Sequence, residues 1–475
     1  MKPAPHDPAP RDPAPRDLTA LELRAAFERR ELGVVEVVAQ ALDRASADTL
    51  GAFTTLNPEQ ALAAAAAAQR AIDDGTAGPL AGVPTAIKDL EPTRGIRTTM
   101  GSALFADWIP AVDDTIVATL RSAGLVSVGK TTVPELGAAC YTEPEVSAPS
   151  RSPYAPALSA AGSSGGAAVA VAAGIVPVSQ GSDTAGSLRS PAGACGVVGL
   201  KPSRGLLTGG LIGADGLGLT TKGPLARTVR DAAALLDAMA VAAPVGTVHP
   251  ARRGGFLGAC DERAERLVVV VAEGSISGGE VDERITRACA DAGRALAGLG
   301  HRVHHRTQPV DEDLVSGFSR MFGALAAAKP LPGGDEAEHR LRPIVRHLRE
   351  RARATDSGEL AASILTVQAR AAAWAERFGD ADIVIAPTVT QPPVPVGALR
   401  NDADPAAELE AMTRFTGNTI IANATGFPAI SLPLGWTDDG VPLGVMLTAT
   451  WGRDDLLLAV AGVLENERPW RDRTP

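Results

Sequence analysis

The sequence predicts an α/β fold, in which a single large α/β/α domain has a mixed central sheet covered by helices. Short apolar stretches of strand length alternate with segments whose apolar residues recur at helical spacing, the pattern of a sheet covered by helices. After residue 20, no stretch has the composition of a linker between domains. A chain of 475 residues is long for one domain, but large α/β enzymes reach this length as one compact unit.

The first half of the chain supplies the N-terminal helices and the first strands. Residues 18–75 predict N-terminal helices, and within them residues 18–48 predict two surface helices. Residues 79–90, PLAGVPTAIKDL, predict a turn that leads into a short buried strand. Residues 115–132 predict a helix that stops at Gly124 and a strand after it.

The second half repeats this alternation. Residues 266–306 predict a buried strand, a helix with acidic residues in its first turn, and a further strand. Residues 311–378 are more polar and helical, interrupted by KPLPGGDE. Residues 380–388 and 429–449 return to strands, and residues 453–467 predict a closing helix.

Charge and hydropathy exclude two classes of partner. The net charge is −10, and the Lys and Arg residues form no basic tract, so we expect no nucleic-acid binding and infer a small-molecule ligand. No apolar run approaches the roughly 18 to 20 residues of a membrane span, so we expect no membrane association.

The cysteines and the N-terminus bear on the compartment. The four cysteines show no close pairing in the sequence and suggest reduced thiols in the cytoplasm: Cys140, Cys195, Cys260 and Cys289. Residues 1–17 consist largely of a repeated Pro-Ala unit that cannot bury apolar surface, so we expect a disordered or extended tail. It has no apolar segment typical of a signal peptide.

Two serine motifs fit known nucleophile patterns but lack their structural context. GSSGG matches G-x-S-x-G around Ser164, but a loop rather than a strand precedes it, and no histidine occurs between His6 and His249. SVGK matches S-x-x-K, but in a strand Ser127 and Lys130 would point to opposite faces. We therefore favour neither motif as a catalytic centre.

Three histidines near the end of the second α/β unit resemble a metal cluster. In a strand, His304 and His305 point to opposite faces, and no Cys, Asp or Glu stands at ligand spacing beside them or His301. A solvent-exposed edge strand explains them better, and we expect no metal site.

Three unusual features together point to catalysis without histidine. Lys88 ends an apolar strand that would carry its ammonium into the interior. The glycine-serine loop at 162–166 opens a helix. Ser187 follows a second buried strand at a turn whose successive N–H groups can converge on an oxyanion.

At these residues the sequence resembles the amidase signature family. The defining run is present as AGSSGG followed by SDTAGSLRSPAG, with GVPTAIKD upstream, and Lys88 lies 75 residues before Ser163 and Ser187 lies 24 after it. Further matches, such as GPLARTVRDAAALLDAM and NATGFPAISLPLG, cover most of the chain. The pattern of these motifs is similar to that of bacterial amidases that hydrolyse cyclic amides and nylon oligomers.

The resemblance implies the amidase signature fold, with a signature core at 79–240 and a variable segment at 311–378 that helps to form the acyl pocket. It implies a Ser-cisSer-Lys triad that needs no metal or organic cofactor. The residues and roles it implies are Ser187 as nucleophile, Ser163 as the bridging serine after a cis peptide, Lys88 as base, Thr184, Ala185, Gly186 and Ser187 as oxyanion donors, Gly137 and Ala138 beside the leaving group, and Tyr141 near the acyl pocket.

The proposed chemistry requires a lysine with a lowered pKa, and the sequence departs from the family pattern at Ala161, at Ala185 and in the segment SAPSRSPY before the first loop. A lysine has a reference pKa of about 10.4, so a base working near pH 8 needs a pKa lowered by roughly 2 to 3 units, which burial can supply. Ala161 replaces a glycine before the first loop, and Ala185 replaces the first glycine of the more usual D-T-G-G-S.

The leading hypothesis is an amidohydrolase that cleaves the C–N bond of a linear or cyclic carboxamide through an acyl-enzyme. One alternative is acyl transfer to an amine in a biosynthetic pathway. Another is the amidase subunit of a tRNA-dependent amidotransferase, and a third is an inactive, ligand-binding relative. The family resemblance also allows a homodimer.

Overall fold

The structure, a computed structural model, describes residues 14–207, 217–240 and 255–475. The expected tail at 1–17 therefore lies outside the described residues up to position 13. Its last residues form a short 3-10 helix, η1 (Pro15–Asp17), and the Arg16 carbonyl accepts a hydrogen bond from Arg227. Residues 15–17 are therefore helical, although the composition predicts a disordered or extended tail there.

Two mixed sheets form the centre of the molecule. The strands of the first are β1 (Phe53–Leu56), β2 (Pro84–Lys88) and β3 (Val126–Thr131), in the order β1-β3-β2. Those of the second are β4 (Val178–Asp183), β5 (Val198–Lys201), β6 (Thr221–Ala226), β7 (Val268–Glu273), β8 (Arg302–Thr307), β9 (Ile383–Pro387), β10 (Ala429–Trp436) and β11 (Pro442–Ala449), in the order β4-β6-β5-β10-β11-β9-β7-β8. The pairs β2–β3, β7–β8 and β7–β9 are parallel, and the other paired strands are antiparallel.

Strands β2 and β4 lie where the two sheets meet. Hydrogen bonds from side-chain hydroxyls to backbone carbonyls connect them, and no backbone ladder pairs them. The Thr85 hydroxyl donates to the Val178 carbonyl at 3.0 Å, and the Ser179 hydroxyl donates to the Ala86 carbonyl at 3.0 Å. The sequence predicts one mixed central sheet, whereas the ladder is interrupted at this seam. Lys88 lies at the end of the seam, so its side chain enters the space between the two sheets.

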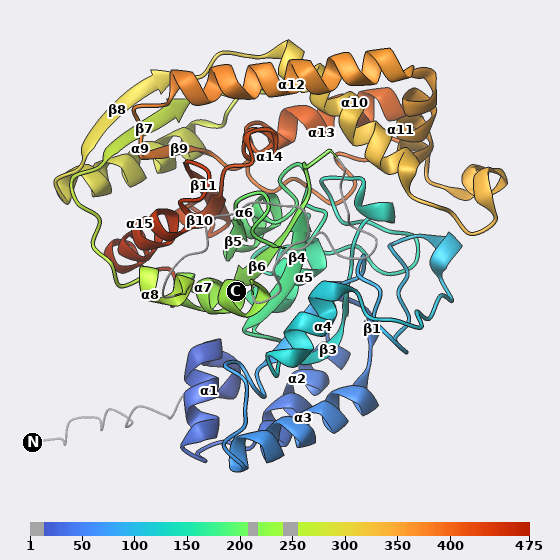
Figure 1. The fold of residues 1–475 in the computed structure, drawn as a ribbon, viewed down its shortest axis with the longest axis vertical. Coiled ribbons are helices and arrows are strands. Elements are labelled where there is room, and N and C mark those ends of the chain that lie inside the picture. The colour runs from blue at the N-terminus through green and yellow to red at the C-terminus, as the bar shows by residue number, and fades with distance from the viewer. Residues whose placement is uncertain (1–13, 208–216, 241–254) are drawn as a thin grey trace, which may run out of the picture.

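Helices cover both faces of the larger sheet, as Figure 1 shows. The helices are α1 (Ala20–Glu28), α2 (Val34–Ser46), α3 (Pro58–Asp73), α4 (Thr115–Ser122), α5 (Gly165–Ala172), α6 (Arg189–Cys195), α7 (Val229–Met239), α8 (Phe256–Ala259), α9 (Glu283–Gly298), α10 (Glu312–Ala328), α11 (Pro343–Ala354), α12 (Ser357–Arg377), α13 (Pro405–Thr416), α14 (Ile420–Thr425) and α15 (Asp454–Glu467). Shorter 3-10 turns are η2 (Ala103–Phe105), η3 (Glu135–Gly137) and η4 (Gly334–Arg340).

Alternation along β7 shows the layers directly. Val269 and Val271 pack in the core cluster that includes α7, α9 and α15, whereas Val270 packs in the cluster with α10, α12 and α14. A strand buried on both faces accounts for the continuous apolar run from which it was predicted. The α/β fold with helices on both sides of a mixed sheet is thereby confirmed.

The predicted helices and strands at 18–48, 115–132, 266–306 and 453–467 are all present. Local signals begin several of them. Thr19 and Glu22 form a capping box at α1, and the Asp282 carboxylate accepts the Arg284 N–H at the start of α9. Within the described ranges, none of the helices is both long enough and apolar enough to cross a membrane.

Candidate active site

Lys88 ends β2 with its side chain fully buried. Its ammonium nitrogen lies 2.8 Å from the Ser163 hydroxyl oxygen and 3.2 Å from the Ser182 carbonyl oxygen, to both of which it donates. The backbone N–H of Lys88 donates to the Gln180 side-chain oxygen at 3.0 Å. Strand β4 therefore fixes both the backbone and the side-chain end of this lysine.

Burial lowers the pKa of Lys88 from 10.5 to about 7. The carboxylates of Glu91 and Asp183 oppose this change, whereas the positive charges of Lys222 and Lys329 add to it. Loss of hydration disfavours the charged form of a buried amine. A substantial fraction of Lys88 is consequently neutral near pH 7, which meets the requirement derived for a base.

In the loop at 162–166, before α5, close packing against neighbouring backbone requires glycine. A Cβ atom at Gly162 would come within 3.0 Å of the Tyr141 backbone, and one at Gly166 within 3.0 Å of the Thr132 backbone. The peptide between Gly162 and Ser163 is cis, as the family resemblance implies. Ala161, which replaces a glycine, has a φ of 56°, so this departure stands where glycine would be relaxed.

The turn that carries Ser187 is organised by a buried carboxylate. Asp183, at the end of β4, forms an ion pair with Arg189 at 2.8 Å and accepts the N–H groups of Gly186 and Leu188 at 2.8 and 3.1 Å. Burial alone would raise the pKa of Asp183, but Arg189 and Asn423 together lower it well below its usual range. This anion holds the turn in one conformation.

The same carboxylate changes the expected set of oxyanion donors. All four N–H groups from Thr184 to Ser187 were expected to be available, but that of Gly186 is engaged by Asp183. In the part of the chain that the structure describes, the N–H groups of Thr184, Ala185 and Ser187 have no protein acceptor. Ala185 does not adopt a positive φ, so its methyl group is accommodated.

The two serine loops meet. The Ser164 N–H donates to the Ser187 carbonyl at 3.1 Å, and the position of a Cβ at Gly137 would lie 3.6 Å from the Ser163 hydroxyl. Ser163 is buried and Ser187 is partly exposed. Among the described residues, no direct hydrogen bond joins the hydroxyl groups of Ser163 and Ser187.

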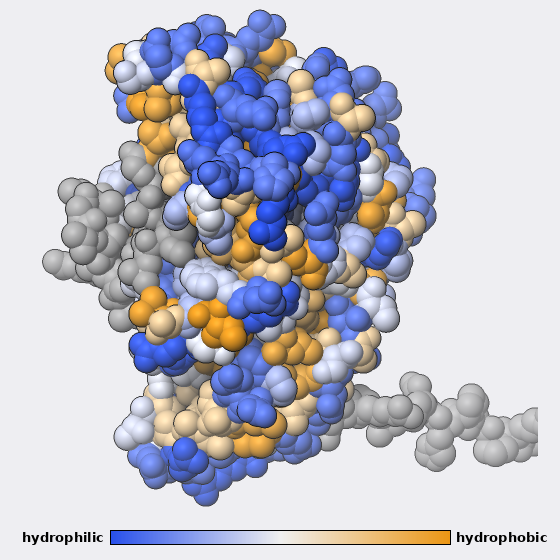
Figure 2. All heavy atoms as spheres, turned by 90° about the vertical axis from the view of Figure 1, so that its right-hand side faces the viewer, coloured by the Kyte–Doolittle hydropathy of each residue, from blue (hydrophilic) through white to orange (hydrophobic). Residues whose placement is uncertain are grey.

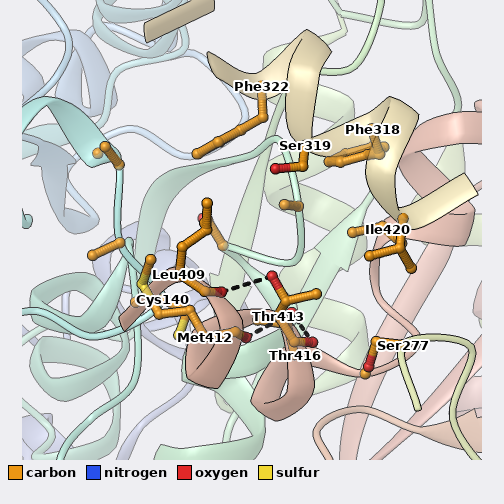
Figure 3. A pocket seen from close by; sticks show the side chains of 18 residues that line it. Cys140, Ser277, Phe318, Ser319, Phe322, Leu409, Met412, Thr413, Thr416 and Ile420 are labelled. Carbon is orange, nitrogen blue, oxygen red and sulfur yellow. Dashed lines mark hydrogen bonds between the residues drawn. The ribbon is translucent and has the colours of Figure 1, made fainter. Parts of the chain in front are cut away.

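Ser187 lies in the wall of a pocket, shown in Figure 3, that encloses about 680 Å³ including space open to solvent. The lining residues are uncharged and come from the end of η3 and the segment after it, the two serine loops, the segment after β7, α10 and the α13–α14 region: Gly137, Ala138, Ala139, Cys140, Gly162, Ala185, Ser187, Ser277, Val315, Phe318, Ser319, Phe322, Leu409, Met412, Thr413, Thr416, Gly417 and Ile420. The hydroxyls of Thr413 and Thr416 donate to carbonyls of their own helix at 2.8 and 3.1 Å. The pocket is therefore mainly apolar.

Of the three residues expected to bind substrate, two line this pocket. Gly137 and Ala138 do, whereas Tyr141 does not. The Tyr141 ring is buried, its hydroxyl donates to the Glu408 carboxylate, and Arg342 donates to it at 3.1 Å. Sequence position brings the backbone of Tyr141 against Gly162, but it did not reveal which way the side chain turns.

Of the motifs set aside from sequence, Ser164 adjoins this site through its backbone, whereas the S-x-x-K and histidine motifs do not line the pocket. Ser164 stands at the N-cap position of α5, but its hydroxyl donates to the Ser182 carbonyl at 3.3 Å and forms no capping hydrogen bond. On β3, Lys130 is buried beside Asp89 at 3.4 Å, and Ser127 does not contact it. His304 and His305 are exposed on β8, the end strand of its sheet.

Sequence reasoning missed three residues that support the Ser187 turn. Arg189 donates to the Asn423 side chain at 2.7 Å and to the Thr419 carbonyl at 2.8 Å, and Asn423 donates to the Asp183 side chain at 3.0 Å. Thr419 and Asn423 come from the α14 region and lie 230 and 234 residues after Arg189 in the chain. The arginine in the SLR run was the available signal, but its partners leave no local pattern.

Comparison with known proteins shows the family of the chain. A family model described as Amidase matches residues 36–458. The chain is 35% identical to a 6-aminohexanoate-cyclic-dimer hydrolase of Paenarthrobacter ureafaciens, over 84% of this chain and 85% of that protein. It is 34% identical to one of the subunits of the glutamyl-tRNA(Gln) amidotransferase of Thermus thermophilus, over 94% of this chain and 97% of that protein.

Among solved structures, one of a 6-aminohexanoate cyclic dimer hydrolase superposes with a TM-score of 0.88 at 31% identity, covering 97% of this chain and 99% of that one. The family match spans most of the chain, including both serine loops and Lys88. The overall fold and the sequence relationship therefore agree: this chain belongs to the amidase signature family.

Proposed function

We propose that the protein hydrolyses a carboxamide with Ser187 as nucleophile, Ser163 as proton relay and Lys88 as base. The observation that carries this proposal is the 2.8 Å hydrogen bond between Lys88 and Ser163, made by a buried lysine with a pKa near 7. A serine hydroxyl becomes an effective nucleophile only when a nearby base takes its proton. Neutral Lys88, acting through Ser163, supplies that base.

The reaction would proceed in two steps. Ser187 attacks the amide carbonyl carbon while its proton passes to Ser163 and the Ser163 proton passes to Lys88. The tetrahedral oxyanion accepts hydrogen bonds from the free N–H groups of Thr184, Ala185 and Ser187. Lys88 returns a proton through Ser163 to the leaving amine, the C–N bond breaks, and water cleaves the resulting acyl-enzyme. Hydrogen bonds of this kind are often longer before substrate binds, which fits the unbonded hydroxyls of Ser163 and Ser187.

The pocket beside Ser187 would hold the acyl half of the substrate. Because none of its lining side chains is charged, burying a charged acyl group there would cost its hydration without a compensating partner. We therefore propose a neutral, largely apolar acyl group. The similarity to a 6-aminohexanoate-cyclic-dimer hydrolase supports a linear or cyclic amide.

The direct test is covalent labelling of Ser187 by a fluorophosphonate, followed by mass spectrometry. The wild type is expected to be labelled at Ser187, and Ser187→Ala to be unlabelled. Lys88→Ala should label at least 100-fold more slowly, given that general-base catalysis typically contributes about 10² to 10⁴. A folded wild type that fails to label between pH 6 and 9 would exclude the proposed triad.

The amidase component of a tRNA-dependent amidotransferase is the second candidate, because similarity to a protein of that kind is nearly as high and covers more of the chain. The net charge of −10 weighs against direct contact with RNA. Co-purification with the other components of such a complex would support this candidate.

Acyl transfer to an amine is the other alternative reaction. It is distinguished by adding amines, which would form new amides in place of the free acid. Whether the protein forms a homodimer stays a prediction.

A further inference from the structure

A buried ion pair that the proposed reaction does not use lies behind Lys88. Lys222 on β6 contacts the carboxylate of Glu91, which follows β2, and their side chains are 5% and 1% exposed. Burying two charges is costly, and replacing such a pair with apolar residues often leaves stability unchanged or improved. Stability therefore does not explain why this ion pair lies next to the proposed base.

Glu91 is connected to Lys88 by two short paths. Its N–H donates to the Lys88 carbonyl at 3.1 Å, closing the turn after β2. The Gln180 amide nitrogen donates to the Glu91 carboxylate at 3.4 Å, and the Gln180 oxygen accepts the Lys88 N–H at 3.0 Å. Gln180 thus links the ion pair to the strand position that carries the base.

The charges around the Lys88 ammonium come from several elements. Glu91 and Asp183 favour the charged form, whereas Lys222 and Lys329 disfavour it, and burial has the largest effect. Asp183 is already paired with Arg189 at 2.8 Å, and Lys329 donates to the Leu136 carbonyl at 2.5 Å.

A second buried pair packs against the same turn. Lys130 lies 3.4 Å from Asp89 and donates to the Glu91 carbonyl at 2.6 Å, but the largest effects on the pKa of Lys88 come from burial, Glu91 and Lys222. Glu91 and Lys222 thus contact each other and have opposite effects on the pKa of Lys88: Glu91 raises it and Lys222 lowers it.

We propose that Glu91, Lys222 and Gln180 are positioning residues for the base: Gln180 fixes the Lys88 backbone, and the ion pair keeps the opposing charges near its ammonium in balance. This inference rests on the proposed function, in which Lys88 must be neutral to accept a proton. Removing either charge alone would leave the other unopposed. The pH at which Lys88 becomes competent would then move in a direction set by the charge that remains.

The test measures the rate of Ser187 labelling by a fluorophosphonate from pH 5 to 10, which needs no known substrate. In Lys222→Met the remaining carboxylate stabilises the ammonium, so the acid limb should move up by about one pH unit. In Glu91→Gln the remaining ammonium disfavours it, so the limb should move down by about one pH unit. The double variant should return to within a few tenths of a unit of the wild type.

Two matched controls separate charge from folding. Lys222→Arg keeps the charge and should keep the wild-type midpoint. Lys130→Arg keeps the charge of the neighbouring buried pair, and it too should leave the midpoint unchanged. Thermal unfolding of each variant shows whether it is folded before labelling is compared.

A further variant, Gln180→Leu, tests the proposal without breaking an ion pair. It should lower the plateau rate about tenfold or more while leaving the midpoint within a few tenths of a unit, since no charge is removed. An unchanged plateau, or single charge variants whose midpoints move together or not at all, would overturn the inference while leaving the triad intact. A wild type that is never labelled would instead overturn the proposed function, and this inference with it.

Discussion

The two serine loops and the helical segment α10–α12 meet at the same pocket but are held in place differently. The loop at 162–166 is fixed by backbone packing, because a Cβ at any of its three glycines would come within 3.0 Å of another atom. The helical segment lies above the loops in Figure 1, and Figure 2 shows many hydrophilic residues on this upper part of the molecule. Part of its attachment depends on side-chain ion pairs such as that between Arg342 and Asp402. Close backbone packing requires glycines that are visible in the sequence, whereas an ion pair between distant residues leaves no local sequence pattern.

The strongest way to break the loop is to add one methyl group. In Gly166→Ala the new Cβ would come within 3.0 Å of the Thr132 N–H and the Ala52 carbonyl, neither of which can rotate away. We expect a loss of about 4 kcal/mol in the free energy of unfolding, measured by urea denaturation. Gly298→Ala is the control: at the end of α9 its Cβ would meet no atom within 4 Å, and it should leave stability equal or slightly higher.

The next prediction tests whether the loop region carries a destabilising group. Because burial lowers the pKa of Lys88 from 10.5 to about 7, the unfolded chain binds this proton more tightly than the folded protein does. Stability is therefore lost as the pH falls from about 10.5 to 7, and the full penalty is present below 7. Lys88→Met should raise the free energy of unfolding at pH 7 by roughly 3 kcal/mol and abolish labelling.

The gain from Lys88→Met should shrink as the pH rises toward 10.5, where the folded lysine is neutral and the unfolded lysine is half neutral. Urea denaturation at pH 7 and pH 10 measures the difference. A variant that is less stable than the wild type at pH 7 would mean that the hydrogen bond to Ser163 outweighs the cost of burying the amine.

The helical segment is tested by removing its buried cation. Arg342 donates to Tyr141 at 3.1 Å and to Asp402 at 2.6 Å, and this cluster lies behind the pocket wall. Arg342→Met should cost about 2 kcal/mol and raise KM for amides with bulky acyl groups, while Ser187 is still labelled. Arg370→Met removes a half-exposed partner of Asp311 from the same segment and should cost less than about 0.5 kcal/mol.

Much of the loop chemistry was accessible from sequence because local features encode it. The apolar run that ends in Lys88 predicts a buried amine, and the glycine-serine loop around Ser163 predicts the start of a helix, α5. No histidine lies between His6 and His249, where both serine loops lie, which argued against the commoner serine activator. These signals are local in the chain, so a single sequence displays them.

The rest depends on partners far apart in the chain. The ion pair of Glu91 and Lys222 joins residues 131 positions apart, and nothing near either one indicates the other. The direction of the Tyr141 ring depends on Glu408 and Arg342, and the use of the Gly186 N–H depends on a carboxylate rotamer. Pattern and periodicity place a residue on an element but do not select its side-chain partner.

The smallest predicted effect concerns the alanine at the edge of the first loop. Ala161 has a φ of 56°, in the left-handed region that costs a non-glycine residue about 1 kcal/mol, and its methyl group is buried. Ala161→Gly relieves the backbone but loses the methyl contacts and gives the unfolded chain more freedom, so the net change should be under about 1 kcal/mol. Ala160→Gly suffers the same two losses without any relief, since Ala160 is buried and has no positive φ. The difference between the two variants, about 1 kcal/mol by urea denaturation, therefore measures the backbone cost at Ala161 alone. Equal losses would mean that packing around this loop, and not the local backbone preference, determines its stability.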